Sequence, residues 1–394
     1  MNPTPNPPAR PRDSRLDSLR GLMLVGMAIN HITSPLQLLT DHPLGYTSSA
    51  EGFVFVSGLV AGLVYTRRRE RLGPTATAVA SWRRAGVIYG CHLALFVGLL
   101  AWTQAFFHLT GEIPGNAPRA MLEHPWASLP FGALLINQPP LLDILPIYAG
   151  FMLLLPFLLS ALSAGRYGLV LGVSGAAWAV TNLAYPQVPY VAGVVQAGAF
   201  NWGAWQFIFV LGVTMGQASA TGRRLLPRPI LPLLLPALAI CTYGFLIRHW
   251  YVPAPFAGFA DWVNKNNLAP VRLLNTLALF YLVHLAFVRW PRAFVWPPLA
   301  LLGRHSLAVF STHVAMAYVL YAFPQYVSTG LAQTWLGTFL MLGTMALVAL
   351  GCERAKRPAP AQSWCSSASL DPAPSGRPSR NVPNQRSSGS VLSP

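Results

Sequence analysis

Two ionisable residues near the start of the chain could perform acid–base chemistry. His31 closes the apolar segment RLDSLRGLMLVGMAINH, eleven residues after Arg20, and Glu51 opens the apolar segment SAEGFVFVSGLVAGLVY. A neutral imidazole can remove a proton from a hydroxyl near neutral pH, and a carboxylate can orient and stabilise that imidazole. We therefore predict that His31 is a general base and that Glu51 is its partner. A structural histidine and a carboxylate at headgroup level are the alternatives.

Polar residues at the ends of later apolar segments could bind a sugar. In AFNWGAWQFIFVLG, Trp205 suits stacking on a sugar ring, and Asn201 and Gln206 suit hydrogen bonding to its hydroxyls. Tryptophan at such a position is also typical of a membrane interface. Asp143 lies in QPPLLDILPIY and His313 in LGRHSLAVFSTHV, where we predict substrate contacts, with a packing role as the alternative for His313.

Two basic residues fall close together in the segment NKNNLAPVRLL. Lys265 and Arg272 suit an anionic ligand, because they are two of only four basic residues on their side of the predicted membrane. Arg272 is equally suited to pair with a carboxylate, either Glu51 or Asp143.

Arginines gather at the opposite end of the predicted helices. Arg20, Arg83 and Arg84 could bind the phosphates of a nucleotide-like donor, because guanidinium groups bind phosphate bidentately. Contact with anionic lipids is the alternative. The sequence has no HExxH motif and no CxxC pair, so no metal site is predicted.

These residues require a membrane helix bundle to position them. The chain has 394 residues, of which 53% are hydrophobic and only 10% charged, whereas soluble domains carry about 25% charged residues. A helix needs about 20 mostly apolar residues to cross a bilayer. We predict an all-α, polytopic bundle with about ten spans, at residues 20–38, 50–66, 85–107, 142–162, 167–184, 203–219, 229–247, 271–288, 304–322 and 333–351.

The positions of the basic residues predict the orientation of this bundle. The net charge is +16, but of the 27 basic residues only four fall on one side of the predicted membrane, namely Arg119, Arg248, Lys265 and Arg272. The positive-inside rule then places both termini in the cytoplasm. The basic excess is thus a topology signal, and membrane lipids rather than nucleic acid are the expected partners.

The composition also divides the chain into three parts. Residues 1–14 are rich in proline and are predicted to be flexible. Residues 15–352 form the predicted membrane domain. Residues 353–394 are rich in Ser, Pro and Arg, which predicts a disordered cytoplasmic tail.

Several motifs resemble those of a known superfamily. LDSLRGLMLVGMAINH resembles the first-helix motif of the acyltransferase-3 superfamily, in which LRG precedes an apolar run that ends in His. SAEGFVFVSGLVAG resembles the acidic segment of that superfamily, and SWRRAGVIYG resembles its RxxR-type helix start. Four further segments resemble the OpgC family, and the matches run in order from residue 13 to about 315. These segments are LLDILPIY, FNWGAWQFIFVLG, LAPVRLLNTLALFYL and LGRHSLAVFSTHV.

The resemblance implies an acyltransferase of the bacterial inner membrane that takes part in succinylation of osmoregulated periplasmic glucans. It implies that succinyl-CoA or acetyl-CoA is the cytoplasmic donor substrate, that a periplasmic carbohydrate is the acceptor, and that no cofactor is bound. It further implies that His31 is catalytic, that Glu51 is its acidic partner and that Arg84 lies on the acyl-CoA side. Val87 stands where the second Arg of an RxxR motif would fall.

Two alternatives stay open from the sequence. The segment DHPLGYTSSAEGF resembles part of the lysosomal glucosaminide acetyltransferases, which makes His42 a second catalytic candidate and matches their Asn to Asn30. A transporter or flippase of an acyl or glycan intermediate, with His31 and Glu51 as a proton relay, is the alternative function.

Overall fold

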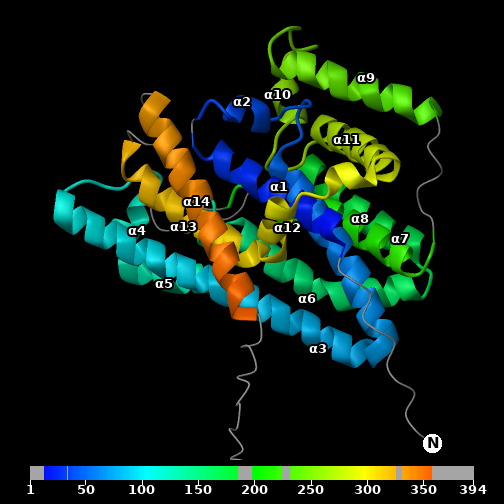
Figure 1. Cartoon of the computed structure of the whole chain (residues 1–394), viewed down its shortest axis with the longest axis horizontal. Helices are drawn as coiled ribbons and strands as arrows, with labels where there is room; N and C mark the ends of the chain where they lie inside the picture. The colour runs from blue at the N-terminus through cyan, green and yellow to red at the C-terminus, as the bar shows by residue number, and fades with distance from the viewer. Residues whose placement is uncertain (1–12, 33, 185–197, 224–230, 325–330, 357–394) are drawn as a thin grey trace, which may run out of the picture. The chain divides into compact units, whose positions relative to one another are not determined.

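The described part of the chain is entirely helical (Figure 1). The computed structural model describes residues 13–32, 34–184, 198–223, 231–324 and 331–356. Within these ranges no strand occurs. The elements are α1 (Ser14–Asn30), α2 (Gln37–Thr40), α3 (Ser49–Thr110), α4 (Arg119–Glu123), α5 (Pro125–Ala133), α6 (Ile144–Ser163), α7 (Tyr167–Ala184), α8 (Trp202–Ala220), α9 (Leu231–Arg248), α10 (Phe259–Trp262), α11 (Pro270–Arg289), the 3-10 helix η1 (Pro291–Phe294), α12 (Pro297–Arg304), α13 (Ser306–Tyr321) and α14 (Leu331–Lys356).

Helix α3 is bent into two legs, seen in blue and cyan in Figure 1. The bend lies at Gly73, whose backbone has φ 81° and ψ 173°, and Pro74 follows it. That conformation is essentially restricted to glycine, and proline has no backbone N–H to continue the helix. The predicted spans 50–66 and 85–107 are therefore the two legs of one bent helix. The basic residues between them are helical and do not form an open loop.

Five helices of the described residues are long and apolar enough to cross a membrane. They are α3, α6, α7, α11 and residues Ala332–Lys356 of α14, while Pro232–Arg248 and Ser306–Tyr321 are shorter apolar helices. The all-helical, membrane-type prediction agrees with this result. The predicted span 20–38 differs from the structure, because α1 ends at Asn30 and the chain turns before α2. Pro35 disfavours helix at the residue before it, which fits this early end.

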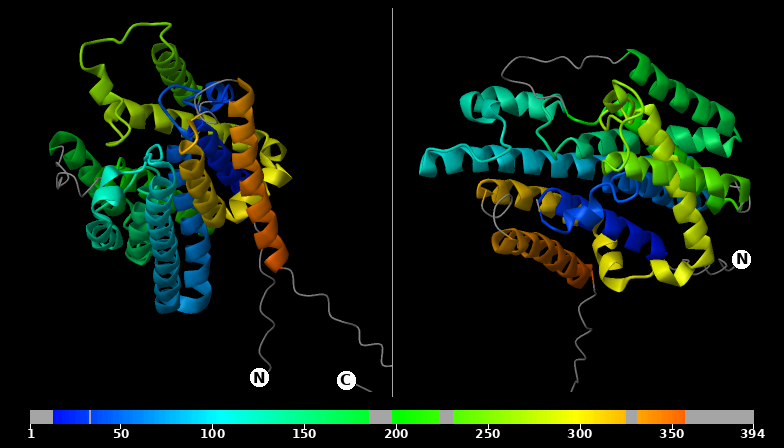
Figure 2. Two further views of the ribbon diagram at one scale, coloured as in Figure 1. Left: turned by 90° about the vertical axis from the view of Figure 1, so that its left-hand side faces the viewer. Right: turned by 90° about the horizontal axis from the view of Figure 1, so that it is seen from above.

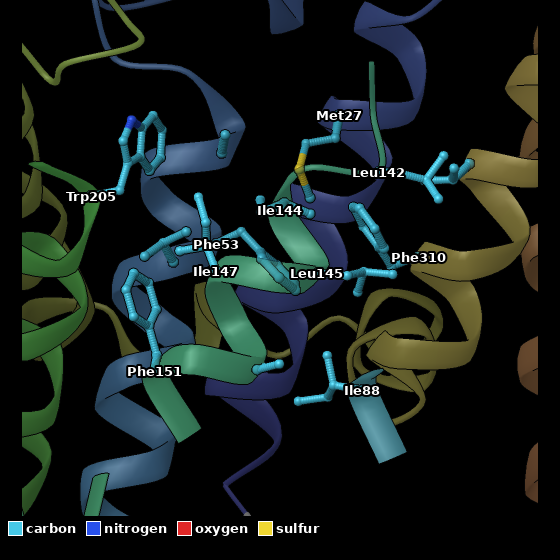
Figure 3. Packing of buried hydrophobic residues seen from close by; sticks show 14 of the residues in the cluster. Met27, Phe53, Ile88, Leu142, Ile144, Leu145, Ile147, Phe151, Trp205 and Phe310 are labelled. Atoms are coloured by element: carbon cyan, nitrogen blue, oxygen red, sulfur yellow. The ribbon is translucent and has the colours of Figure 1, made fainter. Parts of the chain in front are cut away.

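Helix α1 lies between two groups of helices, α3 on one side and α12, α13 and α14 on the other (Figure 2). The buried core between them takes one or more large side chains from each helix. Figure 3 shows this packing, to which α1, both legs of α3, α6, α8 and α13 contribute, as seen in Met27, Phe53, Ile88, Leu145, Trp205 and Phe310. The end of α1 is thus held against helices that come from distant parts of the sequence.

Close contact between α3 and α8 depends on glycine. A Cβ atom at Gly58 or Gly62 would run into the backbone carbonyl of Phe209 or Val213 on α8. Gly212 and Gly216 approach α3 in the same way. Small residues let helix backbones approach closely in membranes. This contact fixes the first leg of α3, which carries Glu51 at its start.

The helix ends extend past two predicted domain boundaries. Ser14 already belongs to α1, and residues 353–356 belong to α14. The rest of the predicted flexible segment (1–12) and of the predicted tail (357–394) lies outside the described residues.

Candidate functional site

The imidazoles of His31 and His313 form a pair at the end of α1. His31 is the C-cap residue of α1 and is half-buried, while His313 on α13 has no exposed surface. His31 Nδ1 lies 2.7 Å from His313 Nε2, the ring centroids are 4.9 Å apart, and the planes differ by 12°. The centroid separation exceeds the N–N distance by about two ring radii. The rings are therefore nearly coplanar and meet edge to edge, as an in-plane hydrogen bond requires.

Glu51 has a different partner from the one that the sequence predicted. Its Oε1 lies 2.5 Å from Nη1 of Arg272 on α11, and its side chain is completely buried. Ser48, at the N-cap of α3, donates both its backbone N–H (2.9 Å) and its hydroxyl to Oε2. Both carboxylate oxygens thus have partners among these groups. Glu51 therefore does not make the direct contact with His31 that the sequence predicted. The contact of His31 Nδ1 is with His313 instead. Of the two carboxylates that the sequence offered to Arg272, Glu51 and Asp143, the structure pairs it with Glu51.

Each of the three nitrogens of the Arg272 guanidinium group contacts another group of the protein. Besides Glu51, its Nε donates to the carbonyl oxygen of Val263 at 2.9 Å, and Nη2 lies 3.2 Å from His42 Nε2. A guanidinium group has five N–H donors in a fixed fork. Arg272 therefore serves here to join α11, the loop before it and the start of α3.

His42, the second catalytic candidate, also has both ring nitrogens engaged. Its Nδ1 lies 2.5 Å from Asp41 Oδ1, and its Nε2 faces Arg272. Asp41 also pairs with Arg248 at 3.1 Å. The hydrogen bond from His42 lowers the pKa of Asp41, the charges of His42, Arg248 and Lys265 act in the same direction, and burial opposes them. Both nitrogens of His42 thus have protein partners, whereas Nε2 of His31 has none within the described residues.

The three predicted sugar-binding residues of α8 are engaged by the protein itself. The indole N–H of Trp205 donates to the carbonyl oxygens of Lys265 and Asn266, both at 3.1 Å, and its ring is 1% exposed. Asn201 caps α8 by accepting from Gly203 N. Trp205 therefore packs in the core (Figure 3) instead of offering an open surface for a sugar.

Gln206, the third of these residues, and Asp143, a further predicted binding residue, are engaged in a similar way. Gln206 donates to the carbonyl oxygen of Ser174 at 2.7 Å, which ties α8 to α7. Asp143 is buried and its Oδ2 accepts from Ala199 N at 2.8 Å.

Lys265 differs from the other basic residues near the site. Its ammonium lies 5.7 Å from the centroid of the Phe200 ring, and no carboxylate within the described residues pairs with it. Its charge nevertheless acts on both His31 and Glu51. Among the described residues of this region, Lys265 is thus a cation that remains open to an anionic ligand.

A large cavity connects the arginine-rich end of the bundle with the start of α3. Its volume is about 2290 Å³, larger than the roughly 300–1,000 Å³ that holds a drug-sized ligand. Thr47 and Ser48 line it at the end next to Glu51, and at the other end it is lined by Arg15, Arg20, Arg67, Arg84, Arg223 and Arg289. Arg20 and Arg84, two of the predicted acyl-CoA residues, therefore share one cavity.

Arg20 and Arg83, both predicted to lie on the acyl-CoA side, differ in their surroundings. Arg20 is buried and donates to Ser306 Oγ at 2.5 Å. Arg83 is exposed and does not line the cavity.

Within the described residues, no group of three or more His, Cys, Asp or Glu side chains could hold a metal ion.

A family model described as "OpgC protein" matches residues 12–357. The chain belongs to the OpgC protein family. The family prediction made from the sequence motifs is therefore confirmed. Searches of the curated proteins and of the solved structures gave no match.

Two contacts of this OpgC family member were not predicted from the sequence. The pairing of His31 with His313 joins residues that are 282 positions apart, and no local pattern connects them. The contact between Ser48 and Glu51 did have a signal, because S-x-x-E at the start of an apolar run is typical of a capping box. This pattern predicts that the Glu51 carboxylate caps the start of the helix by accepting a hydrogen bond from Ser48 N–H.

Proposed function

We propose that this OpgC family protein is an integral inner-membrane O-acyltransferase. It moves a succinyl or acetyl group from cytoplasmic acyl-CoA to a periplasmic glucan or another envelope carbohydrate. The observation that carries the proposal is the edge-to-edge pair of His31 and His313. One nitrogen of a half-buried imidazole is held by the protein, and the other has no partner within the described residues, as a general base requires.

The donor reaches the site through the cavity between α1, α3, α8 and α11. Its arginine-lined end suits the phosphates of acyl-CoA, and its apolar wall suits the hydrocarbon parts of the pantetheine arm. The end beside Ser48 would bring the thioester towards the His31 side of the bundle. With both termini in the cytoplasm, as the arginine distribution predicts, this end faces the periplasm.

The reaction is a direct transfer. His31 Nε2 takes the proton of a sugar hydroxyl while the hydroxyl oxygen attacks the thioester carbonyl carbon. The tetrahedral intermediate then collapses, the C–S bond breaks, and the imidazolium returns the proton to the departing thiolate. The products are the sugar ester and free CoA, with all atoms and charges balanced. Lys265, whose charge acts on His31, is suited to bind the carboxylate of a succinyl donor or the oxyanion.

A transporter with a His31–Glu51 proton relay is the alternative, and the contacts disfavour it. Glu51 binds Ser48 and Arg272, and His31 binds His313. The relay therefore lacks a direct hydrogen bond between its two members.

The test is acyl transfer by purified protein in proteoliposomes. Radiolabelled succinyl-CoA or acetyl-CoA is supplied on the cytoplasmic face and glucan on the other. We expect wild type to label the glucan and His31→Ala to lose at least 100-fold of that rate, in the range that general-base catalysis contributes, about 10²–10⁴. His108→Ala, an exposed histidine at the end of α3, is the matched control and should stay active.

Each other outcome of this assay is informative. If wild type consumes neither donor, the acyltransferase proposal is wrong, and a transport assay with the same vesicles tests the alternative. If His31→Ala stays active while His42→Ala is inactive, the base has been assigned to the wrong histidine.

A further inference from the structure

We propose that His313 is the positioning residue that holds His31 in the base-competent tautomer, by accepting a hydrogen bond from His31 Nδ1–H. The inference rests on the proposed function, because it assumes that His31 is the base. The contact is short, 2.7 Å between Nδ1 and Nε2, and lies in the plane of both rings. An in-plane approach aligns the N–H of one ring with the lone pair of the other.

The direction of this hydrogen bond decides whether His31 can act as a base. A neutral imidazole carries a proton on only one of its two nitrogens. If His31 Nδ1 accepts the hydrogen bond, its Nε2 is protonated and cannot take a proton from a hydroxyl. If His31 Nδ1 donates, its Nε2 is free to accept. The role of His31 therefore requires His313 Nε2 to be the acceptor.

The surroundings of His313 favour that direction. For Nε2 to accept, the proton of His313 must be on Nδ1. His313 Nδ1 is buried and forms no hydrogen bond within the described residues, and the backbone carbonyl of Phe310, three residues earlier on α13, acts electrostatically on the ring. A carbonyl oxygen is only an acceptor, so it favours a protonated Nδ1. The ring of Phe310 also meets His313 edge to face at 5.3 Å between centroids, which limits rotation of the imidazole.

No other group among the contacts of His31 performs this role. In hydrolytic triads a carboxylate holds the tautomer, but here Glu51 is bound to Arg272 and Ser48. His313 is completely buried, and burial of a polar ring is unfavourable unless it forms a hydrogen bond. When His31 gains the substrate proton on Nε2, the bond from Nδ1–H to His313 becomes charge-assisted and therefore stronger. The proton leaves again from Nε2 to the thiolate, and His313 stays neutral.

The test compares His313→Gln with His313→Leu in the proteoliposome assay. The Oε1 of glutamine can take the place of Nε2 as an acceptor, whereas leucine cannot accept a hydrogen bond. We expect His313→Leu to lower kcat by about 100-fold or more with KM for acyl-CoA little changed. His313→Gln should recover most of that loss. His92→Leu, which replaces another fully buried histidine, is the matched control and should keep kcat.

A second measurement does not depend on activity. Histidine ¹⁵N NMR of wild type, compared with His31→Ala, gives the tautomer of His31 directly. Protonated Nδ1 and unprotonated Nε2 are expected in wild type. Protonated Nε2 would overturn the inference even if transfer is observed. So would equal rates for His313→Gln and His313→Leu in an active enzyme. An inactive wild type with the expected tautomer would instead contradict the proposed function and leave the hydrogen bond established.

Discussion

Glu51 and Arg272 form a buried ion pair, and its main consequence at the residue scale is for stability. Both side chains are almost fully buried, and the carboxylate has two further hydrogen bonds from Ser48. Removing one member of such a pair leaves an uncompensated buried charge, which costs about 3–5 kcal/mol. We expect Arg272→Met to lower the free energy of unfolding by that amount, measured by chemical unfolding in mixed micelles.

The double variant separates the pair from its surroundings. Glu51→Gln together with Arg272→Met removes both charges and keeps an acceptor for Ser48. It should therefore be more stable than the sum of the two single changes predicts. Strictly additive losses would mean that the two side chains do not stabilise each other.

Asp41 gives the protein a pH-dependent contact outside the membrane-spanning helices. The hydrogen bond from His42 lowers its pKa below the ordinary 3.8. A carboxylate with a lowered folded-state pKa stabilises the fold above about pH 3.8, and this contribution disappears as the pH falls through the folded-state value. We expect Asp41→Asn to lower Tm in detergent near pH 7. The difference from wild type should shrink to nothing in stronger acid, and a constant difference at all pH values would contradict this assignment.

At the scale of elements, we expect the stability of the protein to depend strongly on the close glycine contact between α3 and α8. A Cβ at Gly62 would meet the Val213 carbonyl, whereas a Cβ at Gly98 on the second leg of α3 meets nothing within 4 Å. We expect Gly62→Ala to destabilise the protein by about 1–3 kcal/mol, because the backbones must separate. Gly98→Ala should be neutral or stabilising by up to about 1 kcal/mol, since alanine favours helix. Thermal unfolding of both variants checks this, and equal effects would mean that the α3–α8 contact is not tight.

At the scale of the whole molecule, the two legs of α3 test the membrane orientation. Thr75 lies exposed at the bend, and Glu112 lies exposed just beyond the end of the second leg. The leg from Pro74 to Thr110 is long enough to cross a bilayer of about 30 Å. The proposed orientation places Thr75 in the cytoplasm and Glu112 in the periplasm.

Single cysteines at these positions, in a chain whose four native cysteines are replaced by serine, make the orientation measurable. We expect Glu112→Cys to react with a membrane-impermeant maleimide in cells whose inner membrane is intact. Thr75→Cys should react only after that membrane is opened. The reverse pattern would contradict cytoplasmic termini.

The sequence alone determined the class of structure, the family and the residues of interest. Apolar composition and the distribution of arginines predicted an all-helical membrane protein, because span length and charge asymmetry are local properties that can be counted along a chain. The motifs around His31 and Glu51 resemble those of the acyltransferase-3 superfamily, and four further segments predicted the OpgC family, which the family match confirms. The Ser48–Glu51 cap was not predicted, although it has a local sequence pattern because it joins residues three positions apart.

Only the tertiary structure decided which of these residues are partners. His31 pairs with His313 from α13, and Glu51 pairs with Arg272 from α11. Trp205 is in the core instead of on a sugar-binding surface. The bend at Gly73 joins two predicted spans into one helix. The contacts of His31, Glu51 and Trp205 join residues that are far apart in the chain, so they depend on how helices pack. Packing arises from side-chain shape and close backbone approach in three dimensions, which no local pattern of residue types records.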